Sequence, residues 1–272
     1  MSAQDEASID LVRSESGSWS VTYRLSEKTS QIGFARNPDN SRVLRWTTKD
    51  HDFEIVRIES REFIRRRDRQ SFDSVELEFI ATYKHLPKDY APFSSFSDGG
   101  LLIHTGRFFS CANACEDEEL EWKFTLTDDR SEFILVDGRQ HRGRASWTDS
   151  VDGTIVFVGK KIQPGTEGAW VIIDPAFPPE VVAMLNSNLP RMIGIFSNKF
   201  GELPNKPGFF ASYDPGHANG SGSQGGTLPN QIFMHFYGDS LEKRLSTPDF
   251  DLWLSWFFAH ETAHLHQTES GA

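Results

Sequence analysis

His260-Glu261-Thr262-Ala263-His264 is the segment of this sequence whose residue types and spacing could do chemistry. On a helix the two histidines are one turn apart and project from the same face, so both imidazoles can reach one tetrahedral metal ion. Glu261 then lies beside the metal, where it can take a proton from a water molecule. This H-E-x-x-H pattern is the signature of zinc hydrolases. It predicts Zn²⁺ as cofactor, His260 and His264 as its ligands and Glu261 as the catalytic general base.

The residues before this pattern predict a helix that can carry it. Ser246-Thr247-Pro248-Asp249 offers an N-cap hydroxyl, a proline suited to the first helical position and an early carboxylate. No helix breaker follows, and the aromatic residues share one helical stripe with the histidines: Trp253, Trp256, Phe257, His260 and His264. We therefore expect a buried helix whose histidines need partners. The alternative to a metal is a pair of core histidines hydrogen-bonded to backbone or carboxylate groups.

The composition excludes several classes of partner. The 272 residues are enough for one large domain or two ordinary ones. The net charge of -11 argues against a nucleic-acid partner, because phosphate binding requires a basic surface. No apolar run is long enough for a membrane span. We expect neither nucleic acid nor membrane insertion.

The N-terminus and the cysteines leave the compartment open. Residues 1–6 do not form a signal peptide, and they fit both a cytoplasmic start and a processed periplasmic or secreted protein with an added methionine. Cys111 and Cys115 fit a loop disulfide if the protein is exported, and they fit two unpaired thiols equally well. No nearby residues complete a zinc knuckle around them.

Residues 1–165 predict an all-β domain. Apolar and polar residues alternate through residues 19–25, 75–83 and 120–126, as they do in strands with one buried face. Residues 153–159 predict a more buried strand that follows an Asp-Gly turn. These strands favour an antiparallel sandwich or a saddle-like sheet.

The pattern changes near residue 165, and residues 166–272 predict an α+β region. Residues 169–174 are expected to form a strand. A helix should follow from Pro178 to Gly201, with a break or kink at Pro190.

Two further strands are expected at residues 209–213 and 231–237. The glycine-rich residues 217–226 between them predict a mobile loop. The helix with the H-E-x-x-H pattern comes last.

This order of elements resembles the first half of the catalytic domain in the glutamate-zincin (gluzincin) clan, above all aminopeptidase-N-like and glycyl-aminopeptidase-like metallopeptidases. Phe200-Gly201-Glu202-Leu203-Pro204 is similar to the helix-ending segment found there. His260, Glu261 and His264 match the zinc and general-base positions. The resemblance implies a large β domain ahead of residues 166–272, which would be the N-terminal lobe of a thermolysin-like catalytic domain. It also implies a zinc-dependent metallopeptidase with a peptide substrate.

Gly226-Thr227-Leu228-Pro229-Asn230 lies where aminopeptidases of this clan carry a Gly-Ala-Met-Glu-Asn segment at the substrate edge. Gly226 and Asn230 fit that segment, so the resemblance implies that they bind substrate. Pro229 stands in place of the glutamate that binds the free amine of the substrate, so endopeptidase and exopeptidase action both stay open. Residues 231–237 are then the expected edge strand along which an extended peptide adds itself.

The clan's third zinc ligand is a glutamate on a later helix, and this sequence ends at Ala272. Neither His266 nor Glu269 is expected to replace it, because His266 points to another side of the helix and Glu269 follows His264 too closely. We therefore expect a truncated protein with weak zinc binding and negligible peptidase activity. The uncovered apolar face of the last helix predicts self-association.

Two other interpretations stay open. The chain could be a non-catalytic peptide- or partner-binding module whose last helix carries no metal. It could also be a zinc hydrolase of a non-peptide substrate, because a fold does not fix the substrate.

Overall fold

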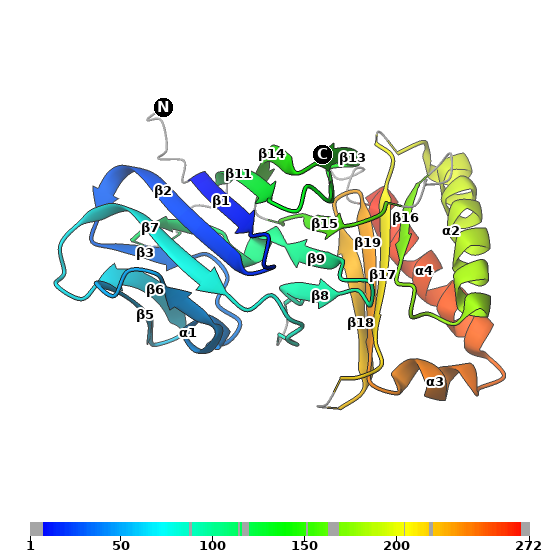
Figure 1. Ribbon diagram of the computed structural model, residues 1–272. Helices are drawn as coiled ribbons and strands as arrows, with labels where there is room; N and C mark the ends of the chain where they lie inside the picture. Colours follow the sequence, from blue (N-terminus) through cyan, green and yellow to red (C-terminus); the bar gives the residue numbers. More distant parts are fainter. Residues whose placement is uncertain are drawn as a thin grey trace. The chain divides into compact units, whose positions relative to one another are not determined.

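The computed structural model describes residues 8–86, 89–113, 115, 120–150, 152–162, 169–203, 205–217 and 220–267. The chain forms two compact units (Figure 1). Unit 1 consists of Met1–Phe93, Ile103–Ile134 and His141–Gly153, and unit 2 consists of Ser94–Leu102, Leu135–Gln140 and Thr154–Ala272. The predicted boundary near residue 165 lies outside the described residues.

Unit 1 is built from short strands. They are β1 (Ser8–Arg13), β2 (Trp19–Thr29), β3 (Gln31–Phe34), β4 (Trp46–Thr48), β5 (Phe53–Ile58), β6 (Arg61–Arg66), β7 (Phe72–Phe79), β10 (Ser110–Ala112), β11 (Glu121–Asp128) and β14 (Arg144–Ser150). Its helical segments are α1 (Ser41–Arg45) and the 3₁₀ helix η1 (Thr105–Arg107). Four strands have residues in both units: β8 (Phe93–Ser95), β9 (Leu101–His104), β12 (Phe133–Val136) and β13 (Arg139–Arg142).

Two sheets enclose the core of unit 1. One contains β4-β7-β2-β1-β11-β14 as consecutive strands of an eleven-stranded sheet, and the other has the order β10-β3-β6-β5. Phe34 of the second sheet lies with its ring centroid 6.0 Å from that of Tyr23 and 5.8 Å from that of Trp46, both in the first sheet. Strands pair antiparallel within both sheets, except that β1 and β11 are parallel. Unit 1 is therefore mostly β, as predicted, and its strands pair antiparallel apart from that one pair.

The alternating segments of unit 1 form strands as predicted, but the ends of the strands differ: β2 continues to Thr29, past the predicted end at residue 25. β7 ends at Phe79, whereas the prediction continued to residue 83. Ile80 is 54 % exposed, so the apolar alternation no longer has a buried face beyond Phe79. Cys111 and Cys115 form a disulfide, which decides between the two alternatives for these residues.

The centre of unit 2 is a four-stranded sheet with helices on one face (Figure 1). Unit 2 contains β15 (Ile155–Gly159), β16 (Trp170–Ile173), α2 (Pro179–Phe200), β17 (Gly208–Asp214), β18 (Gly222–Leu228), β19 (Gln231–Tyr237), α3 (Ser240–Leu245) and α4 (Phe250–Gln267). The sheet has the order β16-β17-β19-β18; β16, β17 and β19 are parallel, and β18 is antiparallel to β19. Among the described residues, no helix has the length and apolarity that a membrane crossing requires.

Helix α2 runs without interruption from Pro179 to Phe200, which corrects the predicted break at Pro190. Its residues at successive turns are buried in one core with the sheet and α4: Val181, Leu185, Leu189 and Ile193. This stripe lies on both sides of Pro190, so packing against the sheet stabilises both halves of the helix. Gly201 has a φ of 103° at the end of α2, where the sequence predicts a stop.

Strand β18 begins at Gly222, so it includes the second half of residues 217–226, which were predicted as a mobile loop; residues 218 and 219 lie outside the described residues. β18 also corrects the predicted edge of the sheet. Gly222 pairs with Tyr237 and Leu228 with Gln231, so β19 is internal and β18 is the edge strand. Glycine is usually a strand breaker, but here it permits close packing. A Cβ atom added at Gly225 would lie 2.5 Å from Cζ of Phe257 in α4.

Candidate metal centre on helix α4

Helix α4 starts within two residues of the predicted position, but the expected hydroxyl cap serves another helix. Thr247 Oγ1 donates to the carbonyl oxygen of Arg244 at 2.7 Å, and Ser246 Oγ donates to that of Lys243 at 2.7 Å. These carbonyls end α3, a short helix that the sequence did not predict. Their lack of further intrahelical partners explains why they attract the two hydroxyls.

The buried face of α4 is not the predicted aromatic and histidine stripe. The fully buried residues are Phe250, Leu254, Phe258, Thr262 and Leu265. Trp253 and Phe257 are half-buried, whereas Trp256 is 61 % exposed and His260 is also exposed. Apolar residues occur around most of this helix, and the sheet and α2 cover only one side of it.

The two histidines of the H-E-x-x-H pattern converge on one point. Their Nε2 atoms lie 3.1 Å apart, and their ring centroids lie 4.7 Å apart. The His260 ring also stacks on Trp256 at 5.4 Å, which restricts its orientation. Two nitrogen ligands of one tetrahedral zinc ion are separated by about 3.3 Å. The donor set and its spacing therefore fit two positions of a zinc site.

Glu261 is positioned by the edge strand. It is 9 % exposed, and Thr227 Oγ1 lies 2.6 Å from its Oε2 atom and 3.1 Å from its backbone oxygen. The first distance is short, as is usual for a hydroxyl that donates to a carboxylate. Oε1 of Glu261 takes no part in this contact with Thr227.

Two contacts with β18 and one with its neighbour β19 hold α4 against this edge of the sheet in a fixed register. Trp253 contacts Phe236, the partner of Ser223 in the sheet, with ring centroids 6.1 Å apart. Phe257 then contacts Gly225, and Glu261 contacts Thr227. Four helical residues rise about 6 Å and two strand residues about 6.6 Å, so the same register repeats along both elements.

The described residues contain no group of three or more histidine, cysteine or acidic side chains arranged to hold a metal. His266, two residues after His264, lies against the rings of Phe196 and Phe200 in α2, at 5.9 and 6.1 Å. It therefore points away from the other two histidines, as predicted. Glu269 lies outside the described residues.

The two residues expected to bind substrate do not join the α4 residues through their side chains. Gly226 pairs with Phe233, and alternation along β18 places it on the opposite face from Thr227. Asn230 has a φ of 56° in the turn between β18 and β19, where its Nδ2 donates to the carbonyl oxygen of Lys206 at 3.1 Å. Its Oδ1 is buried and has no hydrogen-bond partner among the described residues.

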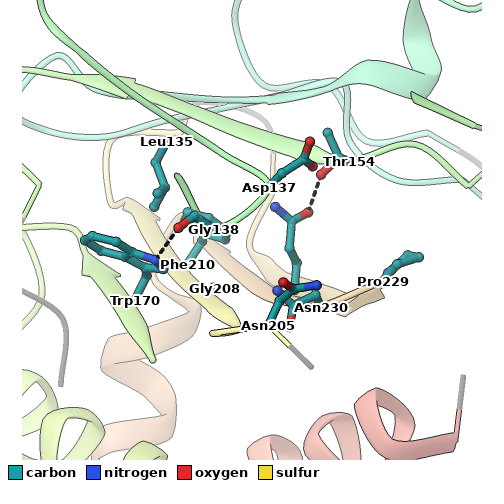
Figure 2. A pocket seen from close by; sticks show the side chains of 11 residues that line it. Leu135, Asp137, Gly138, Thr154, Trp170, Asn205, Gly208, Phe210, Pro229 and Asn230 are labelled. Carbon is teal, nitrogen blue, oxygen red and sulfur yellow. Dashed lines mark hydrogen bonds between the residues drawn. The ribbon is translucent and has the colours of Figure 1, made fainter. Parts of the chain in front are cut away.

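Asn230 lines a different hollow, of about 230 Å³ (Figure 2). The hollow is lined by Leu135, Asp137, Gly138, Thr154, Trp170, Asn205, Gly208, Phe210, Pro229, Asn230 and Gln231. Trp170 Nε1 donates to the carbonyl oxygen of Gly138 at 2.9 Å, and Thr154 donates to the Gln231 amide at 3.0 Å. None of the three α4 residues lines this hollow, so it is separate from the candidate metal centre.

Thr227 contacts Glu261, although no motif in the sequence singles it out. The resemblance of this segment to aminopeptidases rests on Gly226 and Asn230, whereas the contact with Glu261 is made by the Thr227 side chain. The available signal was alternation: in a strand, Gly225 and Thr227 share a face. Only the pairing of β18 with β19 reveals that this face is turned toward α4.

The comparison with solved structures identifies the fold. The aminopeptidase N family protein of Idiomarina loihiensis superposes with a TM-score of 0.63 and 11% sequence identity, over 95% of this chain and 47% of that protein. This chain has the fold of that aminopeptidase N family protein. It spans about half of that protein's length.

Two other solved structures are similar to the chain at lower scores. Native yeast LTA4 hydrolase has a TM-score of 0.49 and 13% identity, over 96% of this chain and 43% of that one. An M1 zinc metallopeptidase of Deinococcus radiodurans has a TM-score of 0.39 and 13% identity, over 84% and 58%. No protein-family model matches the sequence, and no curated protein matches it.

Proposed function

We propose that this chain is part of a zinc-dependent metallopeptidase that hydrolyses peptide bonds with Glu261 as general base. The observation that carries the proposal is the convergence of the His260 and His264 Nε2 atoms, 3.1 Å apart, one turn from each other on α4. Glu261 lies between them in the sequence and is held by Thr227. The aminopeptidase N family fold supports the same chemistry for these residues.

In this proposal His260 and His264 hold the zinc ion. When bound, zinc supplies Lewis-acid chemistry, which polarises a carbonyl group and acidifies a water molecule. Glu261 accepts the proton of the attacking water at Oε1 and delivers it to the leaving amine. Thr227 keeps the carboxylate in one orientation through its contact with Oε2. Burial of Glu261 limits competition from bulk water at that carboxylate.

The peptide substrate would add to β18, because β18 is the edge strand and faces α4 through Thr227 and Gly225. An extended peptide on this edge runs past Glu261. We further propose that unit 2 is the N-terminal lobe of a thermolysin-like catalytic domain and that unit 1 is the β domain that precedes it.

Zinc binding by residues 1–272 tests the assignment of the ligands. Because the described residues supply two histidines as zinc ligands, we expect weak zinc binding and negligible peptidase activity. His260→Ala and His264→Ala should each abolish the remaining zinc binding in a competition titration with a chromophoric chelator. His266→Ala is the matched control and should leave it unchanged, because His266 lies against Phe196.

Each other outcome of this titration has a meaning. Tight stoichiometric zinc binding, together with peptide hydrolysis that is lost in Glu261→Gln, would contradict the expected weak binding. It would show that residues 1–272 supply all the ligands that the zinc ion needs. Equal zinc binding by the wild type and the His260 and His264 variants would refute the site. Peptide binding without any zinc binding would favour the non-catalytic module, and turnover of non-peptide substrates alone would favour the other hydrolase.

A further inference from the structure

A basic hollow lies at the beginning of the edge strand. It has a volume of about 490 Å³ and is lined by Ser221, Gly222, Ser223, Phe236, Ser240, Lys243, Arg244 and Thr247. Two of these residues are basic, four carry a hydroxyl group and none is acidic. This composition contrasts with the net charge of -11 of the whole chain. The hollow therefore offers positive charge to an anionic group.

Arg244 is the basic residue of this hollow whose side chain can bind an anionic ligand. Lys243 is paired with Asp239 at 2.9 Å, whereas no acidic side chain among the described residues pairs with Arg244. The Arg244 guanidinium lies 4.7 Å from the ring centroid of Trp253, on α4, and that contact orients it. An oriented guanidinium can bind a carboxylate through two parallel hydrogen bonds.

The hollow and the proposed catalytic carboxylate lie along the same face of β18. Ser223 and Thr227 are four residues apart, so alternation turns both toward α4. Four strand residues span about 13 Å. A peptide paired with β18 would place three of its own side chains on this face: one opposite Thr227, one opposite Gly225 and one, four residues from the first, opposite Ser223 and Arg244.

We propose that this hollow binds a carboxylate of an extended peptide paired with β18, four residues from the peptide residue opposite Thr227. The proposal rests on the proposed peptide substrate and adds its chemical class, a peptide with an acidic group at a fixed distance from the scissile bond. The carboxylate can come from an aspartate or glutamate side chain or from the C-terminus of the peptide. Both sources present the same two oxygens to Arg244.

Binding of short peptides to residues 1–272 tests the proposal without any need for turnover. Three nine-residue peptides with an acetylated N-terminus and a neutral fluorophore would be compared by fluorescence anisotropy. The first carries one glutamate and an amidated C-terminus, the second carries glutamine instead, and the third carries glutamine and a free C-terminal carboxylate. We expect the glutamate peptide, the free-carboxylate peptide or both to bind about three- to tenfold more tightly than the neutral peptide.

Charge reversal assigns this preference to one residue. Arg244→Glu should abolish the preference for carboxylate and make a lysine-containing peptide the tightest ligand. Arg244→Gln should abolish the preference without reversing it, and it avoids a new negative charge if Arg244→Glu fails to fold. Arg191→Glu, on the exposed side of α2, is the matched control for net charge and should keep the preference.

Equal binding of all three peptides, or an equal effect of the Arg191 and Arg244 substitutions, would overturn the proposal. Absence of peptide binding by every variant would overturn it as well. Failure of the zinc proposal gives a different result, because His260→Ala would then leave zinc binding unchanged while the carboxylate preference persists. The two experiments therefore fail independently.

Discussion

Thr227 Oγ1 lies 2.6 Å from Oε2 of Glu261, so the edge strand of the sheet directly holds the carboxylate of the H-E-x-x-H motif. Glu261 is 9 % exposed and has little access to water as an alternative donor. This contact is the last of three that place α4 against β18 and its neighbour β19. The strand proposed to bind the peptide therefore also orients the proposed general base.

Replacement of Thr227 by valine should destabilise the protein, because valine keeps the shape of threonine but removes the donor to a buried carboxylate oxygen. We expect a loss of about 1–3 kcal/mol in the free energy of unfolding, measured by urea denaturation. Thr227→Ser keeps the hydroxyl and should lose less than half as much. Equal losses in the two variants would show that the contact has no energetic weight.

Gly225→Ala should destabilise unit 2, because the new methyl group would lie 2.5 Å from Phe257 Cζ and 2.8 Å from the carbonyl oxygen of Phe233. The second neighbour is backbone and cannot rotate away, so we expect a loss of about 1–3 kcal/mol in thermal or urea unfolding. Gly194→Ala is the matched control. Gly194 lies within α2 with no atom within 4 Å of the added methyl group, and this change should stabilise by up to about 1 kcal/mol. Stabilisation by both substitutions would contradict the close approach of α4.

The contrast between these two glycines shows how far the sequence predicts this fold. The helix of the H-E-x-x-H motif and the strands β2, β7, β11 and β19 follow from local periodicity, which the sequence displays directly. The glycines of β18 predicted a loop instead of a strand. Gly225 is needed there because the ring of Phe257, which is distant in the sequence, packs against it. The same limit applies to the candidate site: spacing alone predicts the pair His260 and His264, whereas the contact of Thr227 depends on strand pairing.

The exposed parts of α4 were also beyond prediction from periodicity. A helix with aromatic residues around most of its circumference displays no single buried face in its sequence. Trp256 and His260 are exposed because the sheet and α2 cover the side that carries Leu254 and Phe258. Which side is covered is a property of the tertiary packing.

The stability of the protein should fall as the pH falls below about 6.5, partly because of His235. Burial, and then the charge of His217, lowers the pKa of His235 to about 3. Between that pKa and the unfolded value near 6.5, the unfolded chain binds a proton that the folded protein does not. Each pH unit in this window therefore costs up to about 1.4 kcal/mol of stability, and the loss is complete near pH 3.

His235→Asn tests this slope, because asparagine does not titrate and its amide can occupy the position of Nδ1, 2.7 Å from Ser212 Oγ. In urea unfolding between pH 5 and pH 6.5 the variant should show a smaller decrease of stability with falling pH than the wild type. Ser212→Ala is the control. It removes the hydrogen bond but keeps the imidazole, so stability should fall at every pH while the slope remains. An unchanged slope in His235→Asn would assign the pH dependence to other groups.

Self-association should depend on one exposed face of α4. Leu252 is 73 % exposed and Trp256 is 61 % exposed, and their spacing of four residues places them next to each other on the helix. Burial of either side chain in a contact between two molecules would contribute about 1.5–3 kcal/mol. We therefore expect sedimentation velocity to show a concentration-dependent dimer that Leu252→Ser combined with Trp256→Ser weakens more than about tenfold. Ile195→Ser removes an apolar side chain from α2 that is 55 % exposed, and it should leave the dimer intact. A wild-type protein that stays monomeric at several hundred micromolar would show that this face does not mediate association.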